Sequence, residues 1–178
     1  GLGDVYKRQD IAFTRDLLPA VADAGASLIE VGFPFSDPIA DGPVIQASYT
    51  RALANGFTIT KLFETIRRVT CKDEPPGLSR GSEIPPWDKS GGSLSWTTPL
   101  VAMASYSLIY KRNTFFDDAI AAGFSGAVVP DLPVEEAADL VAAARERDFK
   151  IILLVTPTTS PKRAEAIVKA CSGFVYVV

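Results

Sequence analysis

Histidine is absent from the 178 residues of this chain. Its absence excludes histidine-based triads, HExxH metal sites and histidine general bases, so acid–base chemistry must rest on carboxylates, lysine, tyrosine or cysteine. Cysteine is scarce too: Cys71 and Cys171 stand far apart and form no CxxC motif. This pattern argues against a zinc site or a disulfide framework and fits a reducing compartment. We therefore expect a cytoplasmic protein with no metal.

Long apolar runs and an excess of basic charge are also missing. No apolar run approaches the ~18 residues of a membrane-spanning helix, and the N-terminus lacks a signal-peptide pattern. The chain has 18 basic and 21 acidic side chains, a formal net charge of −3 and a pI near 5.0. We expect neither nucleic acid nor a membrane surface as a partner. The composition is that of an ordinary globular protein, and the chain is long enough for one domain.

Both ends of the chain look truncated. Residues 1–9 (GLGDVYKRQ) begin without methionine and show no apolar period, and we interpret them as an adapter-like, non-native tail. A disordered polar tail is the alternative. At the other end, the chain stops inside the apolar run FVYVV with no turn or polar cap after it. We expect a fragment whose single domain covers residues 10–178.

Helical and strand patterns alternate through this domain. Apolar runs predict strands at 27–31, 100–104, 127–129 and 151–155 and from 174 onward, and helical periods occur at 13–24, 43–55, 60–69, 114–122, 134–147 and from 161 onward. Strands that are nearly continuous apolar runs favour a parallel sheet covered by helices. A βα barrel and an open doubly wound sheet both fit. No GxGxxG motif follows a strand, which argues against a dinucleotide site.

Residues 71–98 interrupt this alternation. The segment is rich in proline, glycine and serine and sustains neither a strand nor a helix period, which is typical of a flexible insertion. An insertion of this length is unusual within a compact domain. The rest of the domain is long enough for about five βα units at ~30 residues each.

Glu30 is the first candidate for chemistry. Strand alternation places Leu28 and Glu30 on one face of the strand, and Ile29 and Val31 on the other. In a barrel the first face would look inward, where an apolar setting raises the pKa of a carboxyl group. A raised pKa lets a carboxyl group both donate and accept protons near neutrality. The alternative is a glutamate at a frayed strand end, hydrogen-bonded to loop amides.

Asp41 is the second candidate, in the motif ADGP beside a predicted helix start. Its alternative role is that of an ordinary helix N-cap or turn residue. Pro34, Pro38 and Pro43 stiffen the surrounding loop. A stiff loop suits a site held in one geometry and suits a docking surface equally well.

The run PFSDPIADGPVIQ, with the preceding IEVG, closely resembles the signature of the tryptophan synthase α-subunit family. The resemblance continues through VVPDLPVEEA and LLVTPTTSPKRAEAIVKACSGFVYVV, and it covers nearly all of residues 10–178 outside the insertion. It implies an α/β fold of the (β/α)8 TIM-barrel family. Here that fold would be a partial barrel with about five βα units, strands 2 to 6 of the family.

The resemblance also implies a carbon–carbon lyase of tryptophan biosynthesis, which cleaves indole-3-glycerol phosphate to indole and glyceraldehyde 3-phosphate. The catalytic glutamate of the family falls on Glu30, which would shuttle protons. Its catalytic aspartate falls on Asp41, which would stabilise positive charge at the indole N–H. Its active-site tyrosine falls on Tyr176, which would position Glu30. For Tyr176 the alternative is an aromatic side chain that fills a core strand.

By resemblance, this subunit has no cofactor of its own and joins a pyridoxal-phosphate β subunit in an α2β2 heterotetramer, with the FSDPIADG loop on the docking face. Two departures bear on activity: residues 1–9 replace the first strand of the family, and the phosphate-binding loops would lie beyond Val178. Ser107 also stands where many relatives carry asparagine. A non-catalytic docking subunit, an inactive fragment and another phosphate-handling barrel enzyme are the alternatives.

Overall fold

The computed structural model describes residues 11–36, 42–70 and 96–178. Asp41, the proposed tail at 1–9 and most of the proposed insertion at 71–98 lie outside the described residues. No helix within the described ranges has both the length and the apolar character needed to cross a membrane.

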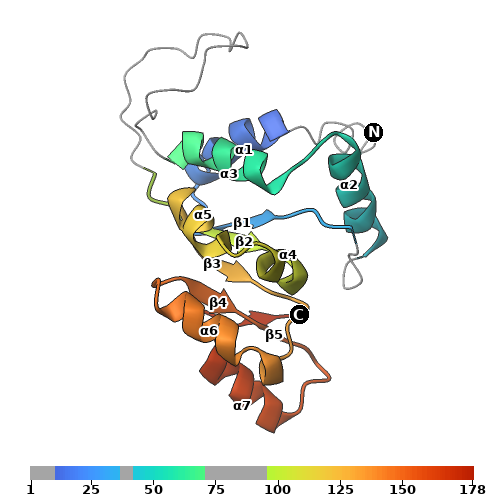
Figure 1. Ribbon diagram of the computed structural model, residues 1–178, viewed down its shortest axis with the longest axis vertical. Helices are drawn as coiled ribbons and strands as arrows, with labels where there is room; N and C mark the ends of the chain where they lie inside the picture. The colour runs from blue at the N-terminus through green and yellow to red at the C-terminus, as the bar shows by residue number, and fades with distance from the viewer. Residues whose placement is uncertain (1–10, 37–41, 71–95) are drawn as a thin grey trace.

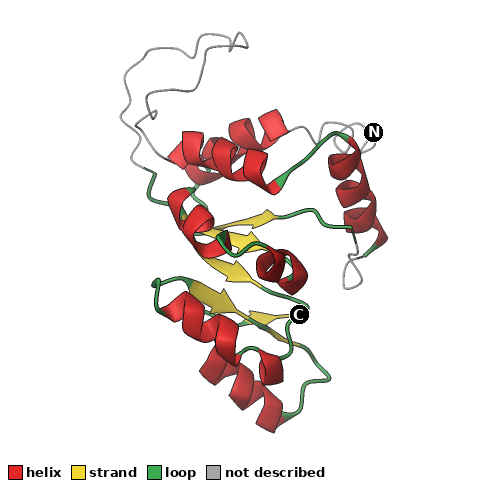
Figure 2. Cartoon of the chain, viewed as in Figure 1, coloured by secondary structure: helices red, strands yellow, loops and turns green. Residues whose placement is uncertain are grey.

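Helices and strands alternate along the chain (Figures 1 and 2). The strands are β1 (Ile29–Gly32), β2 (Leu100–Met103), β3 (Phe124–Val128), β4 (Lys150–Ile152), β5 (Leu154–Val155) and β6 (Tyr176–Val177). The helices are α1 (Ile11–Asp23), α2 (Pro43–Ala54), α3 (Ile59–Thr70), α4 (Tyr106–Lys111), α5 (Phe115–Ala121), the 3-10 turn η2 (Val134–Glu136), α6 (Ala138–Arg145) and α7 (Pro161–Ala170).

The strands of the described chain pair in parallel and in the order in which they occur. One sheet has the order β1-β2-β3-β4, and β5 pairs with β6. Only Leu153 separates β4 from β5, and its carbonyl accepts a hydrogen bond from the Tyr176 amide at 3.2 Å. β4 and β5 therefore act as one strand, which joins β6 to the four-stranded sheet. An open doubly wound sheet reverses its strand order at a switch point. This sheet does not, and its strand order is the one found in a (β/α)8 barrel.

The two faces of the sheet have different partners. Helices cover one face, where Ile29, Val31, Ala102, Ala127 and Ile151 join side chains from α3, α5 and α6 in the main hydrophobic core. The opposite face carries a small separate cluster. We call it the inner-face cluster; it consists of Val101, Val128 and Ile152, with Met103, Leu154 and Tyr176 packed against them. This division is the strand alternation expected for a barrel wall.

Local signals fix the ends of several helices. The N-cap of α2 is Gly42, with Pro43 in the first turn, and the helix ends at Asn55 as the sequence predicts. The hydroxyl of Ser160 caps α7 by accepting a hydrogen bond from the Arg163 amide. Pro19, inside the helical period at 13–24, predicts either a kink or a displaced helix start; helix α1 begins at Ile11 and continues through Pro19, so its start is not displaced.

Three expectations about elements need correction. The helix expected over 134–147 is divided into η2 and α6. The strand expected at 127–129 begins earlier, at Phe124. The helical period from 161 onward also predicts Ile167 and Val168 on the buried side of α7; Ile167 is buried, but Val168 is 56% exposed. Successive helical residues point about 100° apart, so one of this pair faces the core and the other faces solvent.

Candidate active site

Glu30 lies in the middle of β1 and faces away from the helices. Its neighbours Ile29 and Val31 are buried against the helical layer, whereas Glu30 itself is exposed. Glu30 is in register with Val101 of the inner-face cluster, and paired residues of parallel strands project to the same side. The carboxylate therefore lies on the face that becomes the inside of a barrel, as strand alternation predicts.

Partial loss of water raises the pKa of the Glu30 carboxyl above its ordinary value of 4.5. The cause is desolvation by surrounding protein atoms, which disfavours the charged form even though the side chain remains exposed. Within the described ranges, no hydrogen bond or ion pair to this carboxylate occurs that would lower its pKa. The alternative of a glutamate bonded to loop amides finds no support in this part of the chain.

Phe33 fixes the loop that leaves β1. Its ring is fully buried, with centroids of Phe63, Phe124 and Phe115 at 5.5, 5.6 and 6.0 Å. Its amide donates to the carbonyl of Met103 at 2.9 Å. The loop thus begins at a rigid point three residues after Glu30.

Asp41 follows that loop in the sequence, one residue before Gly42. Because Gly42 is the N-cap of α2, the alternative role of Asp41 as the cap of this helix is wrong. A catalytic role for Asp41 remains a prediction.

Tyr176 shares the inner face with Glu30. It begins β6, is partly buried and packs against the inner-face cluster. β2, β3 and β4–β5 lie between β1 and β6, so Glu30 and Tyr176 stand at opposite edges of the sheet. At ~4.8 Å per neighbouring strand, they are roughly 19 Å apart along the sheet. Closure of the sheet into a barrel would make them face each other across the interior.

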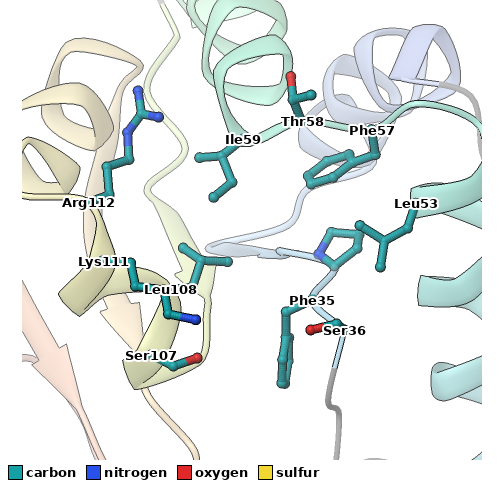
Figure 3. Close-up of a pocket in the computed structure, with 11 residues that line it drawn as sticks. Phe35, Ser36, Leu53, Phe57, Thr58, Ile59, Ser107, Leu108, Lys111 and Arg112 are labelled. Atoms are coloured by element: carbon teal, nitrogen blue, oxygen red, sulfur yellow. The ribbon is translucent and has the colours of Figure 1, made fainter.

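A pocket of about 480 Å³ lies beside the loop after β1 (Figure 3). We call it the α4 pocket; its lining residues are Pro34, Phe35, Ser36, Leu53, Phe57, Thr58, Ile59, Ser107, Leu108, Lys111 and Arg112. They come from the loop after β1, from the end of α2 through the start of α3, and from α4 and the residue that follows it. In Figure 1 the strand arrows point toward the side on which α2 and α4 lie, so the pocket is at the carboxyl ends of the strands.

The two cations of the α4 pocket differ in their surroundings. Arg112 pairs with Asp118 at 2.7 Å and lies 5.6 Å from the ring centroid of Phe63. Desolvation acts to raise the pKa of Asp118, but hydrogen bonds from Thr114 and Arg112 and the positive charge of Arg112 together lower it. Lys111 is exposed at the rim. The pocket lining therefore combines apolar side chains with hydroxyl groups, and Lys111 adds an exposed positive charge.

Sequence reasoning missed helix α4, which forms one wall of this pocket. The helix has only six residues, too few for a periodic pattern. Its one local signal is Ser105, whose hydroxyl accepts a hydrogen bond from the Leu108 amide at 3.3 Å. In the described parts of the chain, no group of three or more histidine, cysteine, aspartate or glutamate side chains is arranged to hold a metal ion.

A parallel sheet with its strands in chain order and with helices on its outer face is the arrangement of the (β/α)8-barrel proteins. The family model described as tryptophan synthase alpha chain matches residues 7–77 and 92–178. The chain belongs to the tryptophan synthase alpha chain family, which confirms the resemblance carried by its motifs.

Curated relatives agree with this membership. The chain is 44% identical over 171 residues to the tryptophan synthase alpha chain of Rhodopirellula baltica, covering 95% of this chain and 54% of the relative. It is 40% identical over 171 residues to that of Trichormus variabilis, covering 95% of this chain and 56% of the relative. The chain thus spans about half the length of the curated relatives it matches.

Solved structures show the same fold. The tryptophan synthase α2β2 complex of Pyrococcus furiosus, studied for mutual activation, includes a chain 35% identical to this one with a TM-score of 0.77, covering 94% of this chain and 61% of that one. Tryptophan synthase subunit alpha from Legionella pneumophila is 29% identical with a TM-score of 0.76, covering 94% and 56%. The expectation of a partial TIM barrel is confirmed.

Proposed function

We propose that this chain is part of a lyase subunit that cleaves indole-3-glycerol phosphate to indole and glyceraldehyde 3-phosphate in tryptophan biosynthesis. The observation that carries the proposal is the position of Glu30. It is a carboxyl group of raised pKa on the inner face of β1, inside the first of the motifs that resemble the family and within the residues that the family model matches.

The reaction needs one group that can both give and take a proton. Glu30 protonates the indole ring carbon that carries the side chain and accepts the proton of the side-chain hydroxyl as the carbon–carbon bond breaks. The electron pair of that bond returns to the indole, and the hydroxyl carbon becomes the aldehyde. A raised pKa increases the protonated fraction of Glu30 at neutral pH, which the first transfer requires.

Two further residues complete the proposed site. Asp41 accepts a hydrogen bond from the indole N–H and stabilises the positive charge that develops on the ring. Tyr176 orients Glu30 across the barrel interior. Support for Tyr176 comes from its position on the inner face, and support for Asp41 comes from the matched motif alone.

We further propose that the protein works in the cytoplasm with a tryptophan synthase β subunit that holds pyridoxal phosphate, and has no cofactor of its own. Support for such a partner comes from the similar Pyrococcus furiosus protein, which is found in an α2β2 complex. The docking face would include the loop after β1, whose residues Phe35 and Ser36 line the α4 pocket.

The test compares Glu30→Gln with the unchanged full-length protein in an assay of indole release. We expect the rate to fall by about 10²–10⁴-fold, because glutamine cannot transfer protons. Glu136→Gln, on the exposed turn η2, is the matched control and should retain activity. Near-normal turnover by Glu30→Gln would contradict the assignment. Stimulation of a β subunit without any indole release would instead indicate a non-catalytic docking subunit.

A further inference from the structure

Gly32 follows Glu30 on the inner face of β1. Strand alternation places the two residues on one face, and Gly32 is in register with Met103, which packs against the inner-face cluster. Two residues along a parallel strand span about 6.6 Å, so Gly32 is the next inner-face position toward the carboxyl end of β1. Because glycine has no side chain, β1 leaves room above this position, beside the carboxylate of Glu30.

Tyr49, on helix α2, reaches this position from outside the strand. A Cβ added to Gly32 would lie 3.5 Å from the hydroxyl oxygen of Tyr49 and 3.9 Å from its ring carbon Cε1. Both are ordinary van der Waals distances, so a methyl group would fit there. The hydroxyl of Tyr49 therefore borders the space that Gly32 leaves on the inner face.

Packing holds the Tyr49 side chain in this place. The residue is 8% exposed, and its ring centroid lies 5.6 Å from that of Phe35, with the two rings tilted by 49°. Phe35 belongs to the loop after β1, which begins at the buried ring of Phe33. Helix α2 itself lies on the side to which the strand arrows point (Figure 1). The hydroxyl thus has a defined position at the carboxyl end of β1.

A ligand of Glu30 comes close to this hydroxyl. Enzymes with a (β/α)8 barrel bind their substrates at the carboxyl ends of the strands. Gly32 lies between Glu30 and that end, so a ligand that exchanges a proton with Glu30 also lies above Gly32 and next to Tyr49. A tyrosine hydroxyl can both donate and accept a hydrogen bond, so it can bind either kind of polar group on the ligand.

We propose that Tyr49 is a substrate-binding residue: its hydroxyl forms a hydrogen bond with indole-3-glycerol phosphate above Gly32, beside Glu30. This inference rests on the proposed function, which brings that substrate to Glu30. The hydrogen bond is the same before and during the reaction, so it lowers KM and leaves kcat unchanged. A tyrosine that served packing alone would need its ring and not its hydroxyl.

The experiment measures kcat and KM for indole release by the full-length protein. Tyr49→Phe keeps the ring and its packing against Phe35 but removes the hydroxyl. We expect KM to rise about fivefold, the effect of one net hydrogen bond, with kcat within about twofold of the unchanged protein. Tyr110→Phe is the matched control, since Tyr110 is 72% exposed on α4, and it should change neither constant.

Gly32→Ala tests the same space independently. The added methyl group fits the folded chain but occupies room that the substrate needs. We therefore expect KM to rise about fivefold or more, the effect of a methyl group forced against a bound ligand. The urea midpoint of this variant should equal that of the unchanged protein, which separates a binding effect from a loss of folding.

The outcomes separate this inference from the proposed function. An unchanged KM in Tyr49→Phe overturns the inference, and so does a fall in kcat with KM unchanged. If Tyr49→Phe does not fold, an unchanged KM in Gly32→Ala overturns it instead. Indole release with normal KM values in both variants would refute the inference alone. If the unchanged full-length protein releases no indole, the proposed function is wrong and the inference falls with it.

Discussion

Phe33 should be the residue of the β1 loop whose truncation costs most stability. Its ring is fully buried and contacts three other phenylalanine rings with centroids within 6.0 Å. It also lies between β1 and the loop that leads toward Asp41. Phe33→Ala removes the ring and leaves a cavity among side chains that belong to β3, α3 and α5.

The size of the effect follows from burial. Replacing a buried phenylalanine by alanine costs about 3–5 kcal/mol, because apolar contact is lost and the cavity closes only partly. Phe33 has no exposed surface and a pair of tilted rings within 5.6 Å. We therefore expect the upper half of this range, about 4 kcal/mol. Phe33→Leu keeps most of the volume and should cost less than about 1.5 kcal/mol.

The assay is urea unfolding of the purified chain, followed by far-ultraviolet circular dichroism. Phe13→Ala is the matched control, since Phe13 is 42% exposed on α1, and it should cost clearly less than Phe33→Ala. The reasoning fails if Phe33→Ala costs under about 1.5 kcal/mol, or if the two alanine variants are equally destabilised. Either result would mean that the four rings do not form a tightly packed unit.

Two further predictions concern the sheet. The raised pKa of Glu30 means that its folded state favours the protonated form, so the stability this group contributes is present below pH ~4.5 and is lost as pH rises through the folded pKa. As the pH rises from about 4 to about 7, the free energy of unfolding of Glu30→Gln in urea titrations should therefore increase relative to that of the unchanged chain. A relative decrease over this pH range would contradict the prediction. In Gly126→Ala the new Cβ would lie 2.7 Å from the carbonyl oxygen of Lys150, and we expect this clash to cost about 1–3 kcal/mol of stability in the same assay. A Cβ at Gly42 would meet open space, so Gly42→Ala is the control without a clash.

The alternation of helices and strands could be predicted because the local signals are strong. Apolar runs mark the strands, and Pro43 and Ser160 mark helix starts in the positions that the structure confirms. The choice between a barrel and an open sheet could not be made from these signals. It depends on which strands become neighbours, and that is a property of the whole chain, seen here in the order β1-β2-β3-β4.

Short elements were missed where tertiary contacts decide the structure. Helix α4 is held by Asp131, a residue 25 positions away in the sequence, and no local pattern predicts that bond. The turn η2 and helix α6 resemble one helix in the sequence because their composition is continuous. In the structure they are separate, and Ala137, between them, is fully buried.

The position of Glu30 could be predicted because burial of its two neighbours on one face of the strand leaves only the opposite face for its side chain. Ile29 and Val31 are buried under the helices, and a shift of one residue would expose both of them and bury the carboxylate in their place. An unpaired charge in that core would cost several kcal/mol. The packing of β1 therefore directs the proposed catalytic group to the inner face, so the same apolar side chains that stabilise the sheet also determine where its chemistry can occur.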